Sequence, residues 1–346
     1  MTDSSLRCEI FCAVVDNYGD AGVCWRLARQ LAHEYRWRVR LWIDDPHALQ
    51  RLAPDSDRVD IRHWRTDAIF DDDGDIVIEA FACELPMQQR HAMARRMPPP
   101  LWINLEYLSA EEWTLACHKL PSPHPPLAKY FYFPGLDPAS GGVLCENDYA
   151  ARRAAFDPVA FRREFGLPPP AQALTISLFA YANPALPELL RQWADAPYPV
   201  HLLQPGVDAP FAAHGALRCY ALPFLPQRRY DELLWVCDVN FVRGEDSFVR
   251  AQWAEKPMVW QIYPQADDTH WDKLDAFLRL YAKVGAGETA LAGFWRAWNG
   301  RGALDWASFY AALPRQAQHA RDWAKSLHAQ PNLARRLVEF CHERLK

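Results

Sequence analysis

The chain has 346 residues, enough for two ordinary domains, each with its own hydrophobic core. Half of the residues are hydrophobic and 23% are charged, a balance typical of folded globular proteins. The formal net charge of −5 argues against a generic nucleic-acid-binding protein, because such proteins present a basic surface. No apolar run approaches the roughly 18 residues that a membrane-spanning helix needs, so we expect no membrane association.

The spacing of the cysteines and the composition of the N-terminal segment indicate the cellular compartment of the protein. The nine cysteines are scattered, and none forms a Cys-x-x-Cys pair, so their spacing is typical of neither a zinc site nor a disulfide framework. The first residues are polar and lack the basic and apolar regions of a secretory signal. We therefore expect a reducing compartment, the cytoplasm.

The first half of the chain alternates short apolar runs with amphipathic stretches. Residues Cys8–Val15 predict a buried strand, and a glycine-containing turn then leads into a helix from about Ala21 to Tyr35. Further strands are predicted at Arg38–Ile43, Asp75–Ile78, Leu101–Leu105 and Tyr130–Phe133. This alternation is typical of a parallel sheet covered by helices.

A weaker pattern from Pro134 to Pro170, with one short helix near Pro158–Phe165, predicts an interdomain connection. A second α/β series follows it, and from Thr269 to Lys346 the pattern is almost wholly helical. Its predicted strands are Leu174–Phe179, Val200–Gln204, Leu217–Leu222, Val239–Val242 and Met258–Ile262, and its predicted helices are Ala185–Ala194, Gln227–Val236 and Ser247–Ala254. Two Rossmann-like domains of this kind would bind ligands at the carboxyl ends of their strands, in a cleft between them.

A first candidate site lies in the turn after the first strand. Asp16 and Asp20 bracket a glycine turn there, and a carboxylate at a strand end is well placed to act as a general base. The spacing Gly19-x-x-Gly22 does not match the dinucleotide-binding fingerprint. The alternative interpretation is that Asp20 only caps the following helix.

A second candidate site lies between the strand Val239–Val242 and the helix after it. Arg243 and Gly244 lead into a helix for which Asp246 or Ser247 would be the cap, and the N-terminus of a helix attracts anions. With Arg243 beside it, this turn could bind a diphosphate. Alternatively, it is an ordinary capped helix with a surface ion pair between Arg243 and Glu245.

A third candidate set consists of aromatic and amide side chains near strand ends of the second half. Phe179, Tyr181, Phe224, Gln227 and Tyr230 could stack on a nucleotide base and hydrogen-bond its edge. The chain contains 45 aromatic residues of the Trp, Phe and Tyr types (15, 17 and 13), so each of these rings could equally belong to a core. We find no H-E-x-x-H, G-x-S-x-G or Walker A motif, and we expect no metal or other cofactor.

Several long segments resemble one known family. The segments Val15–Arg29, Ile78–Pro86 and Trp102–Ser109 resemble those of the elongation factor P arginine rhamnosyltransferases, the EarP family. In the second half, Arg243–Trp253 and Trp260–Gln265 are similar to the same family. Two residues beside these motifs, Ala182 and Glu255, depart from the pattern we expect, which affects fine adjustment of the donor site.

The resemblance implies an α/β fold of the glycosyltransferase B type, with two facing Rossmann-like domains, a central cleft and a helical C-terminus. The N-terminal domain, residues 1–155, would take the acceptor and would be completed by the C-terminal helix at about 325–346. Residues 156–324 would form the domain that binds the nucleotide sugar. The implied activity is inverting transfer of L-rhamnose from dTDP-β-L-rhamnose to an arginine of elongation factor P, which activates that factor to rescue ribosomes stalled at polyproline.

The resemblance also implies roles for individual residues. Asp20 matches the proposed general base of the family, while Asp16 and Glu245 match two further catalytically important carboxylates. The acceptor side would include Asn17, Tyr18 and Gly19. Donor contacts are implied for Phe179, Tyr181, Phe224, Gln227, Tyr230, Arg243, Asp246, Ser247 and Phe248.

Two other functions fit the residues alone. One is a glycosyltransferase that uses another nucleotide sugar or another acceptor. The second is a protein that binds a nucleotide sugar without catalysing a reaction.

Overall fold

The computed structural model describes residues 6–16, 18–54, 58–65, 68, 74–169, 173–265, 267–283 and 289–346. The chain divides into two compact units. Unit 1 consists of residues 1–147 and 330–346, and unit 2 consists of residues 148–329. The division therefore falls just before helix α5 (Tyr149–Ala154), whereas the sequence placed it after residue 155, at the end of that helix.

Unit 1 is built on a seven-stranded sheet in the order β3-β2-β1-β4-β5-β7-β6. All neighbouring strands are parallel except β6, which is antiparallel to β7. The strands are β1 (Arg7–Cys12), β2 (Arg38–Ile43), β3 (Val59–His63), β4 (Ile76–Ala80), β5 (Leu101–Leu105), β6 (Pro121–His124) and β7 (Leu127–Tyr132). The parallel α/β architecture predicted for this half is thus confirmed.

The sequence missed both edge strands of this sheet. In β3 only Val59 is fully buried, so the strand lacks an apolar run, and β6 contains Pro121 and Pro123. Proline is tolerated on an edge strand because no neighbour needs its missing N–H group. Strand β1 is also shorter than predicted and ends at Cys12.

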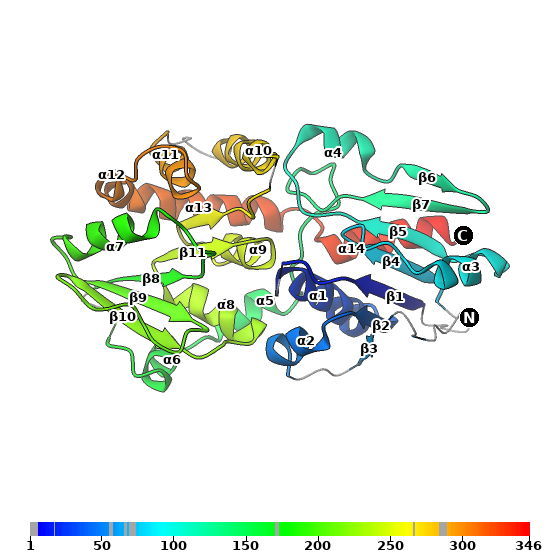
Figure 1. The fold of residues 1–346 in the computed structure, drawn as a ribbon, viewed down its shortest axis with the longest axis horizontal. Helices are drawn as coiled ribbons and strands as arrows, with labels where there is room; N and C mark the ends of the chain where they lie inside the picture. The colour runs from blue at the N-terminus through cyan, green and yellow to red at the C-terminus, as the bar shows by residue number, and fades with distance from the viewer. Residues whose placement is uncertain are drawn as a thin grey trace. The chain divides into compact units, whose positions relative to one another are not determined.

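Five helices complete the described part of unit 1. They are α1 (Gly19–Glu34), α2 (Pro46–Leu52), α3 (Met87–Arg95), α4 (Glu112–Cys117) and α14 (Leu333–Arg344). Helix α14, red in Figure 1, comes from the far C-terminus of the chain. The ring of Phe340 packs against Tyr132 at 5.8 Å, and the backbone N–H of Leu333 donates to the carbonyl of Val143. The C-terminal segment therefore belongs to the core of unit 1.

Unit 2 contains a five-stranded parallel sheet in the order β10-β9-β8-β11-β12. Its strands are β8 (Leu174–Leu178), β9 (Val200–Pro205), β10 (Leu217–Leu222), β11 (Val239–Arg243) and β12 (Met258–Gln261). Its helices, after α5, are α6 (Pro158–Glu164), α7 (Leu186–Ala194), α8 (Gln227–Val236), α9 (Asp246–Trp253), α10 (His270–Ala282), α11 (Thr289–Trp298), α12 (Trp306–Ala311) and α13 (Leu313–His328). These elements confirm the predicted second α/β series and its helical end.

Each sheet has one position where the direction of winding reverses. In unit 1 the chain moves from β1 to β2 and β3 on one side, and β4 then pairs with β1 on the other side. In unit 2 the same reversal occurs between β8 and β11. The loops after such adjacent strands separate, and the crevice at their carboxyl ends is where open α/β sheets bind ligands.

A buried ion pair connects three helices of unit 2. Arg250 on α9 donates from Nε and Nη2 to the two carboxylate oxygens of Asp231 on α8, at 2.8 and 2.7 Å, and both side chains are 0% exposed. Arg152 on α5 binds the same carboxylate at 3.2 Å. Because both charges of the Arg250–Asp231 pair are removed from water, loss of one partner leaves the other uncompensated.

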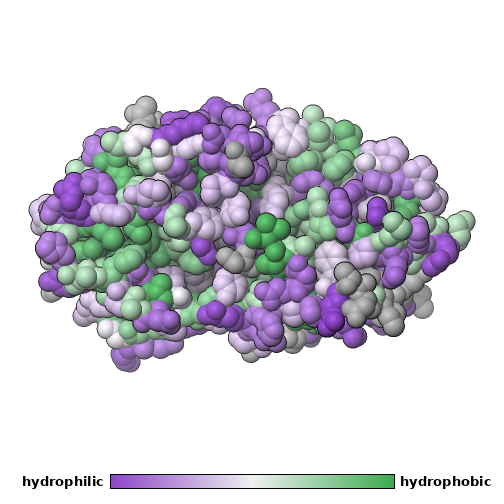
Figure 2. Space-filling model, in the orientation of Figure 1, coloured by the Kyte–Doolittle hydropathy of each residue, from purple (hydrophilic) through white to green (hydrophobic). Residues whose placement is uncertain are grey.

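No helix among the described residues is long and apolar enough to cross a bilayer. Figure 2 shows hydrophilic side chains spread over the visible face, with hydrophobic ones between them. All nine cysteines are free thiols, and six of them, including Cys8, Cys24 and Cys237, are buried. Buried free cysteines of this kind pack as small apolar side chains.

Asp231→Ala should lower the free energy of unfolding by about 3–5 kcal/mol, because Arg250 would be left buried and unpaired. The measurement is urea denaturation followed by tryptophan fluorescence. The matched control is Asp195→Ala, which removes an exposed pair with Arg191 and should cost no more than about 1 kcal/mol. Equal midpoints for the two variants would contradict the importance assigned to the buried pair.

Candidate functional site

In unit 1, Asp20 lies in the first turn of α1 and is only 2% exposed. Its Oδ2 accepts hydrogen bonds from the backbone N–H groups of Val15 and Asp16, at 2.8 and 2.9 Å. The N-cap of α1 is Tyr18, so Asp20 does not cap the helix. Asp20 instead connects the first turn of the helix to the end of the preceding loop.

The environment of Asp20 changes its acidity. Burial raises the pKa of the Asp20 carboxyl, and the nearby charge of Asp16 raises this pKa further. Hydrogen bonds from the backbone of Asp16 and Val15 and from the side chain of Tyr107 act in the opposite direction and lower the pKa. The net effect is an increase, and a higher pKa makes the ionised carboxylate a stronger base.

Gly19 allows the carboxylate of Asp16 to lie close to the start of α1. A Cβ atom on Gly19 would be 2.7 Å from Oδ2 of Asp16, closer than van der Waals contact permits. The N–H of Gly19 also donates to the carbonyl of Asp16 at 2.6 Å. A side chain at position 19 would therefore displace the carboxylate of Asp16 from its place in this turn, which holds both carboxylates near one helix end.

Two further residues, Tyr18 and Asn17, were predicted on the acceptor side. The hydroxyl of Tyr18 accepts a hydrogen bond from Arg51 at 2.8 Å, and the guanidinium of Arg51 lies 5.7 Å from the centre of the Tyr18 ring. Asn17 lies outside the described residues, so its predicted role stays a prediction.

Tyr107 and Phe81 were not identified from the sequence as site residues. Their rings stack at 4.3 Å with an interplanar angle of 13°, and Tyr107 is 36% exposed. Tyr107 also hydrogen-bonds Asp20, so the stacked pair belongs to the same site as the carboxylates. Both residues stand in segments that carry the family resemblance, Ile78–Pro86 and Trp102–Ser109, and this was the signal that could have revealed them.

The loop that carries Phe81 has an unusual backbone. Phe81, Ala82 and Glu84 have φ angles of 56°, 53° and 53°, a region that disfavours side chains. Two buried polar side chains of the sheet hold this loop: Asn104 accepts from the N–H of Ala82, and Glu79 accepts from the N–H of Glu84, both at 3.2 Å. Strain of this kind persists only where the surroundings enforce it, as they do at functional sites.

In unit 2, the guanidinium of Arg243 lies against two predicted aromatic residues. Its central carbon is 4.3 Å from the ring centre of Phe179 and 4.5 Å from that of Tyr181. Arg243 ends β11, and the two aromatic residues follow β8, so the strands at the winding reversal bring them together. The N–H of Tyr181 donates to Oε1 of Gln261 at 2.9 Å, which fixes the loop to the neighbouring strand β12.

The turn from Arg243 into α9 differs from the prediction in one respect. The N-cap is Glu245, and its side chain makes no capping hydrogen bond, so neither Asp246 nor Ser247 caps the helix as expected. The hydroxyl of Ser247 instead donates to the carbonyl of Arg243 and accepts from the N–H of the same residue at 3.1 Å. Gly244 has a φ of +60°, which a glycine adopts without strain.

The remaining predicted donor residues lie at the ends of neighbouring elements. Gln227, the first residue of α8, donates from Nε2 to Oδ2 of Asp246 at 3.2 Å. The ring of Tyr230 lies 5.6 Å from that of Phe179, and burial raises its pKa. Phe224, after β10, is half-buried beside Gly206.

Phe248 is a core residue. Its side chain is 1% exposed and stacks on Trp260 at 4.0 Å, with an interplanar angle of 8°. It also packs against Phe277 at 4.7 Å. The buried ring supports the position of α9, and the predicted contact of Phe248 with the donor stays a prediction.

Within the described residues, no group of three or more His, Cys, Asp or Glu side chains is placed to hold a metal ion. Unit 1 presents carboxylates beside an aromatic pair, which suits a cationic planar group. Unit 2 presents a guanidinium and a helix N-terminus beside aromatic rings, which suits an anion joined to a flat ring.

Comparison with known structures defines the class of protein. A glycosyltransferase of kitacinnamycin matches with a TM-score of 0.53 over 98% of this chain and 99% of that chain, at 14% identity, a likeness of fold alone. The structural neighbours are glycosyltransferases of the B type. The chain is therefore an α/β protein with the glycosyltransferase B fold.

The family follows from closer relatives. Residues 8–342 match the model of the family described as elongation factor P rhamnosyltransferase EarP, and the chain belongs to this family. The protein-arginine rhamnosyltransferase of Pseudomonas putida is 46% identical, over 96% of this chain and 97% of that protein. A structure described as the basis for EarP-mediated arginine glycosylation of elongation factor EF-P matches with a TM-score of 0.70 and 35% identity, over 97% of this chain and 99% of that one.

Tyr107→Phe should raise the pKa of the Asp20 carboxyl further, because the variant loses the hydrogen bond that stabilises the ionised form. Asp16→Asn should lower the same pKa, because it removes a neighbouring negative charge. An NMR titration of protein labelled with ¹³C in its aspartate carboxyl groups measures both shifts. The control Tyr310→Phe, in unit 2, should leave the titration unchanged, and shifts of the same sign in both test variants would contradict the assignment.

Proposed function

We propose that this chain transfers L-rhamnose from dTDP-β-L-rhamnose to an arginine side chain of elongation factor P, with inversion at the anomeric carbon. The observation that supports this proposal best is that the two candidate sites, each at the position where the winding of its sheet reverses, carry complementary side chains. One has a desolvated carboxylate beside stacked aromatic rings, and the other has an arginine beside aromatic rings and a helix start. Membership of the EarP family supports the choice of sugar and acceptor.

The acceptor arginine would bind at the site in unit 1. Its guanidinium is planar and carries a positive charge, with a pKa above about 12 in water, so it is a poor nucleophile until a proton is removed. Asp20 and Asp16 would accept hydrogen bonds from its N–H groups, and the face of the exposed Tyr107 ring would stack on it. Two carboxylates and one ring would thus orient the nucleophilic nitrogen.

The chemical step would be a single displacement. The guanidinium nitrogen forms a bond to the anomeric carbon while the bond from that carbon to the diphosphate oxygen breaks. Asp20 accepts the proton that the nitrogen loses, and the diphosphate departs with the electron pair. Attack opposite the leaving group inverts the configuration of the anomeric carbon.

The donor would bind at the site in unit 2. Arg243 and the N–H groups at the start of α9 would stabilise the charge that develops on the diphosphate. Phe179, Tyr181 and Phe224 would form the surroundings of the thymine base and the sugar. Glu245 would accept a hydrogen bond from a sugar hydroxyl or order Arg243. These residues supply the charge stabilisation without a metal ion, and we propose a metal-independent reaction in the cytoplasm.

Asp20→Asn should reduce rhamnosyl transfer by a factor of about 10²–10⁴, because the amide cannot accept the proton. The measurement is the mass of purified elongation factor P after incubation with the donor, where each transfer adds one deoxyhexose. Binding of dTDP, measured by calorimetry, should stay at the wild-type level. The control Asp195→Asn changes an exposed carboxylate at the C-cap of α7 and should transfer at the wild-type rate, whereas full activity of Asp20→Asn would refute the role as base.

Arg243→Gln should weaken binding of dTDP by about 10- to 100-fold, since a charged hydrogen bond to phosphate contributes roughly 1.5–3 kcal/mol. Isothermal titration calorimetry measures the effect. The control is Arg218→Gln on β10, whose guanidinium donates to the backbone carbonyl of Gly215 and should not affect the nucleotide. Unchanged affinity of Arg243→Gln for dTDP would show that the diphosphate does not bind at this turn. Tighter binding of another nucleotide sugar would show that the proposed donor is wrong.

A further inference from the structure

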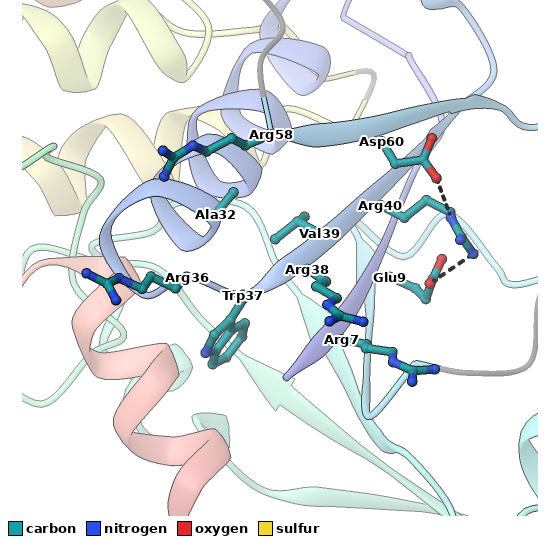
Figure 3. A pocket seen from close by; sticks show the side chains of 10 residues that line it. All are labelled: Arg7, Glu9, Ala32, Arg36, Trp37, Arg38, Val39, Arg40, Arg58 and Asp60. Atoms are coloured by element: carbon teal, nitrogen blue, oxygen red, sulfur yellow. Dashed lines mark hydrogen bonds and ion pairs between the residues drawn. The ribbon is translucent and has the colours of Figure 1, made fainter. Parts of the chain in front are cut away.

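A pocket of about 660 Å³ lies in unit 1 at the amino ends of β1, β2 and β3. Five arginines line it, together with two acidic residues and a small apolar floor, as Figure 3 shows. The arginines are Arg7, Arg36, Arg38, Arg40 and Arg58. The pocket is therefore strongly basic in a chain whose formal net charge is −5.

The two acidic residues of the lining are already neutralised. Arg40 binds Glu9 at 3.3 Å and Asp60 at 2.9 Å, and Figure 3 shows Arg40 between these carboxylates. Glu9 also accepts from Nε1 of the Trp42 indole at 2.6 Å. Both carboxylates of the lining are therefore already engaged in ion pairs with Arg40.

Arg36, Arg38 and Arg58 are exposed to solvent. Within the described ranges, no ion pair joins any of these three guanidinium groups to another residue. Positive charges gathered around one cavity repel each other, and an anion that enters the cavity relieves this repulsion.

Two of these arginines have an unfavourable backbone conformation. Arg36 and Arg58 have φ angles of 58° and 64°, in the left-handed region. Arg36 directly follows the C-cap of α1, and the N–H of Trp37 donates back to the carbonyl of Leu31. Glycine is the usual residue at the position of Arg36, directly after a helix. The left-handed backbone conformation disfavours a side chain at Arg58 as well.

The pocket is separate from the candidate functional site of unit 1. Arg7 and Arg38 begin the parallel strands β1 and β2, and Arg58 directly precedes β3. Asp16 and Asp20 follow the carboxyl end of β1. The two sites therefore lie at opposite edges of the sheet, and the proposed transfer reaction does not account for the basic pocket.

We propose that this pocket binds a small oligophosphate through its phosphate groups. Guanidinium groups form paired hydrogen bonds with phosphate oxygens, and the volume lies in the range of small-ligand sites. The apolar lining residues Ala32, Trp37 and Val39 are at most 5% exposed, so they offer no ring surface on which a base could stack. Recognition would therefore depend on the phosphates, whether they belong to a nucleotide or to an inorganic oligophosphate.

The test is calorimetric titration of the full chain with inorganic triphosphate, in the presence of saturating dTDP to occupy the site in unit 2. The wild type should bind one triphosphate, and Arg36→Gln/Arg58→Gln should weaken this binding at least tenfold. A second variant, Arg38→Glu, should also weaken it. The matched control Arg191→Gln/Arg321→Gln removes two arginines of unit 2 and should bind as the wild type does.

Two further titrations identify the ligand. If ATP binds as tightly as inorganic triphosphate, the pocket recognises the phosphate groups alone. If inorganic triphosphate binds more tightly, the ligand is an inorganic oligophosphate and not a nucleotide. Thermal unfolding confirms that each variant is folded. Absence of triphosphate binding to the wild type, equal binding by the pocket variants, or binding of hexaglutamate in place of triphosphate would overturn the proposal. None of these results depends on rhamnosyl transfer, so the two proposals fail separately.

Discussion

The reversal of winding in a parallel sheet is the constraint on which both candidate sites depend. Where β1 pairs with β4, and where β8 pairs with β11, neighbouring strands send their following loops in opposite directions. The gap that results at the carboxyl ends can be filled only by loop side chains or by a ligand. Asp20 and Phe81 stand at the first gap, and Arg243 and Phe179 stand at the second. These candidate site residues are thus concentrated where the topology leaves space.

These sites are locally unfavourable, and the surrounding structure compensates. Asp20 is a buried carboxylate next to a second carboxylate, and Phe81, Ala82 and Glu84 hold left-handed backbone conformations. Hydrogen bonds that backbone N–H groups donate to side-chain oxygens keep both features in place. In unit 2 the Asp231–Arg250 pair joins α8 to α9, the helix whose first turn carries Ser247. A fold can maintain strain of this kind only where several independent contacts determine each position.

Unit 1 separates opposite charges between the two edges of one sheet. The carboxyl edge presents Asp16 and Asp20, while the amino edge presents the arginines of the basic pocket. A cation and an anion could therefore bind to the same domain without competing for one surface. This separation follows from the parallel arrangement of β1, β2, β3 and β4, since the loops that precede these strands lie at one edge and the loops that follow them lie at the other.

The sequence alone determined the α/β class, most strands, the family and most candidate residues, because buried parallel strands read as apolar runs and the family segments are long. It could not reveal the edge strands β3 and β6, whose short or proline-containing segments owe their pairing to a neighbour. Only the tertiary structure joined Tyr107 and Phe81 to Asp20, assigned Phe248 to a core and gathered the arginines of the basic pocket. Such contacts connect residues far apart in the chain, and no local pattern specifies which side chains a fold brings together or withdraws from water.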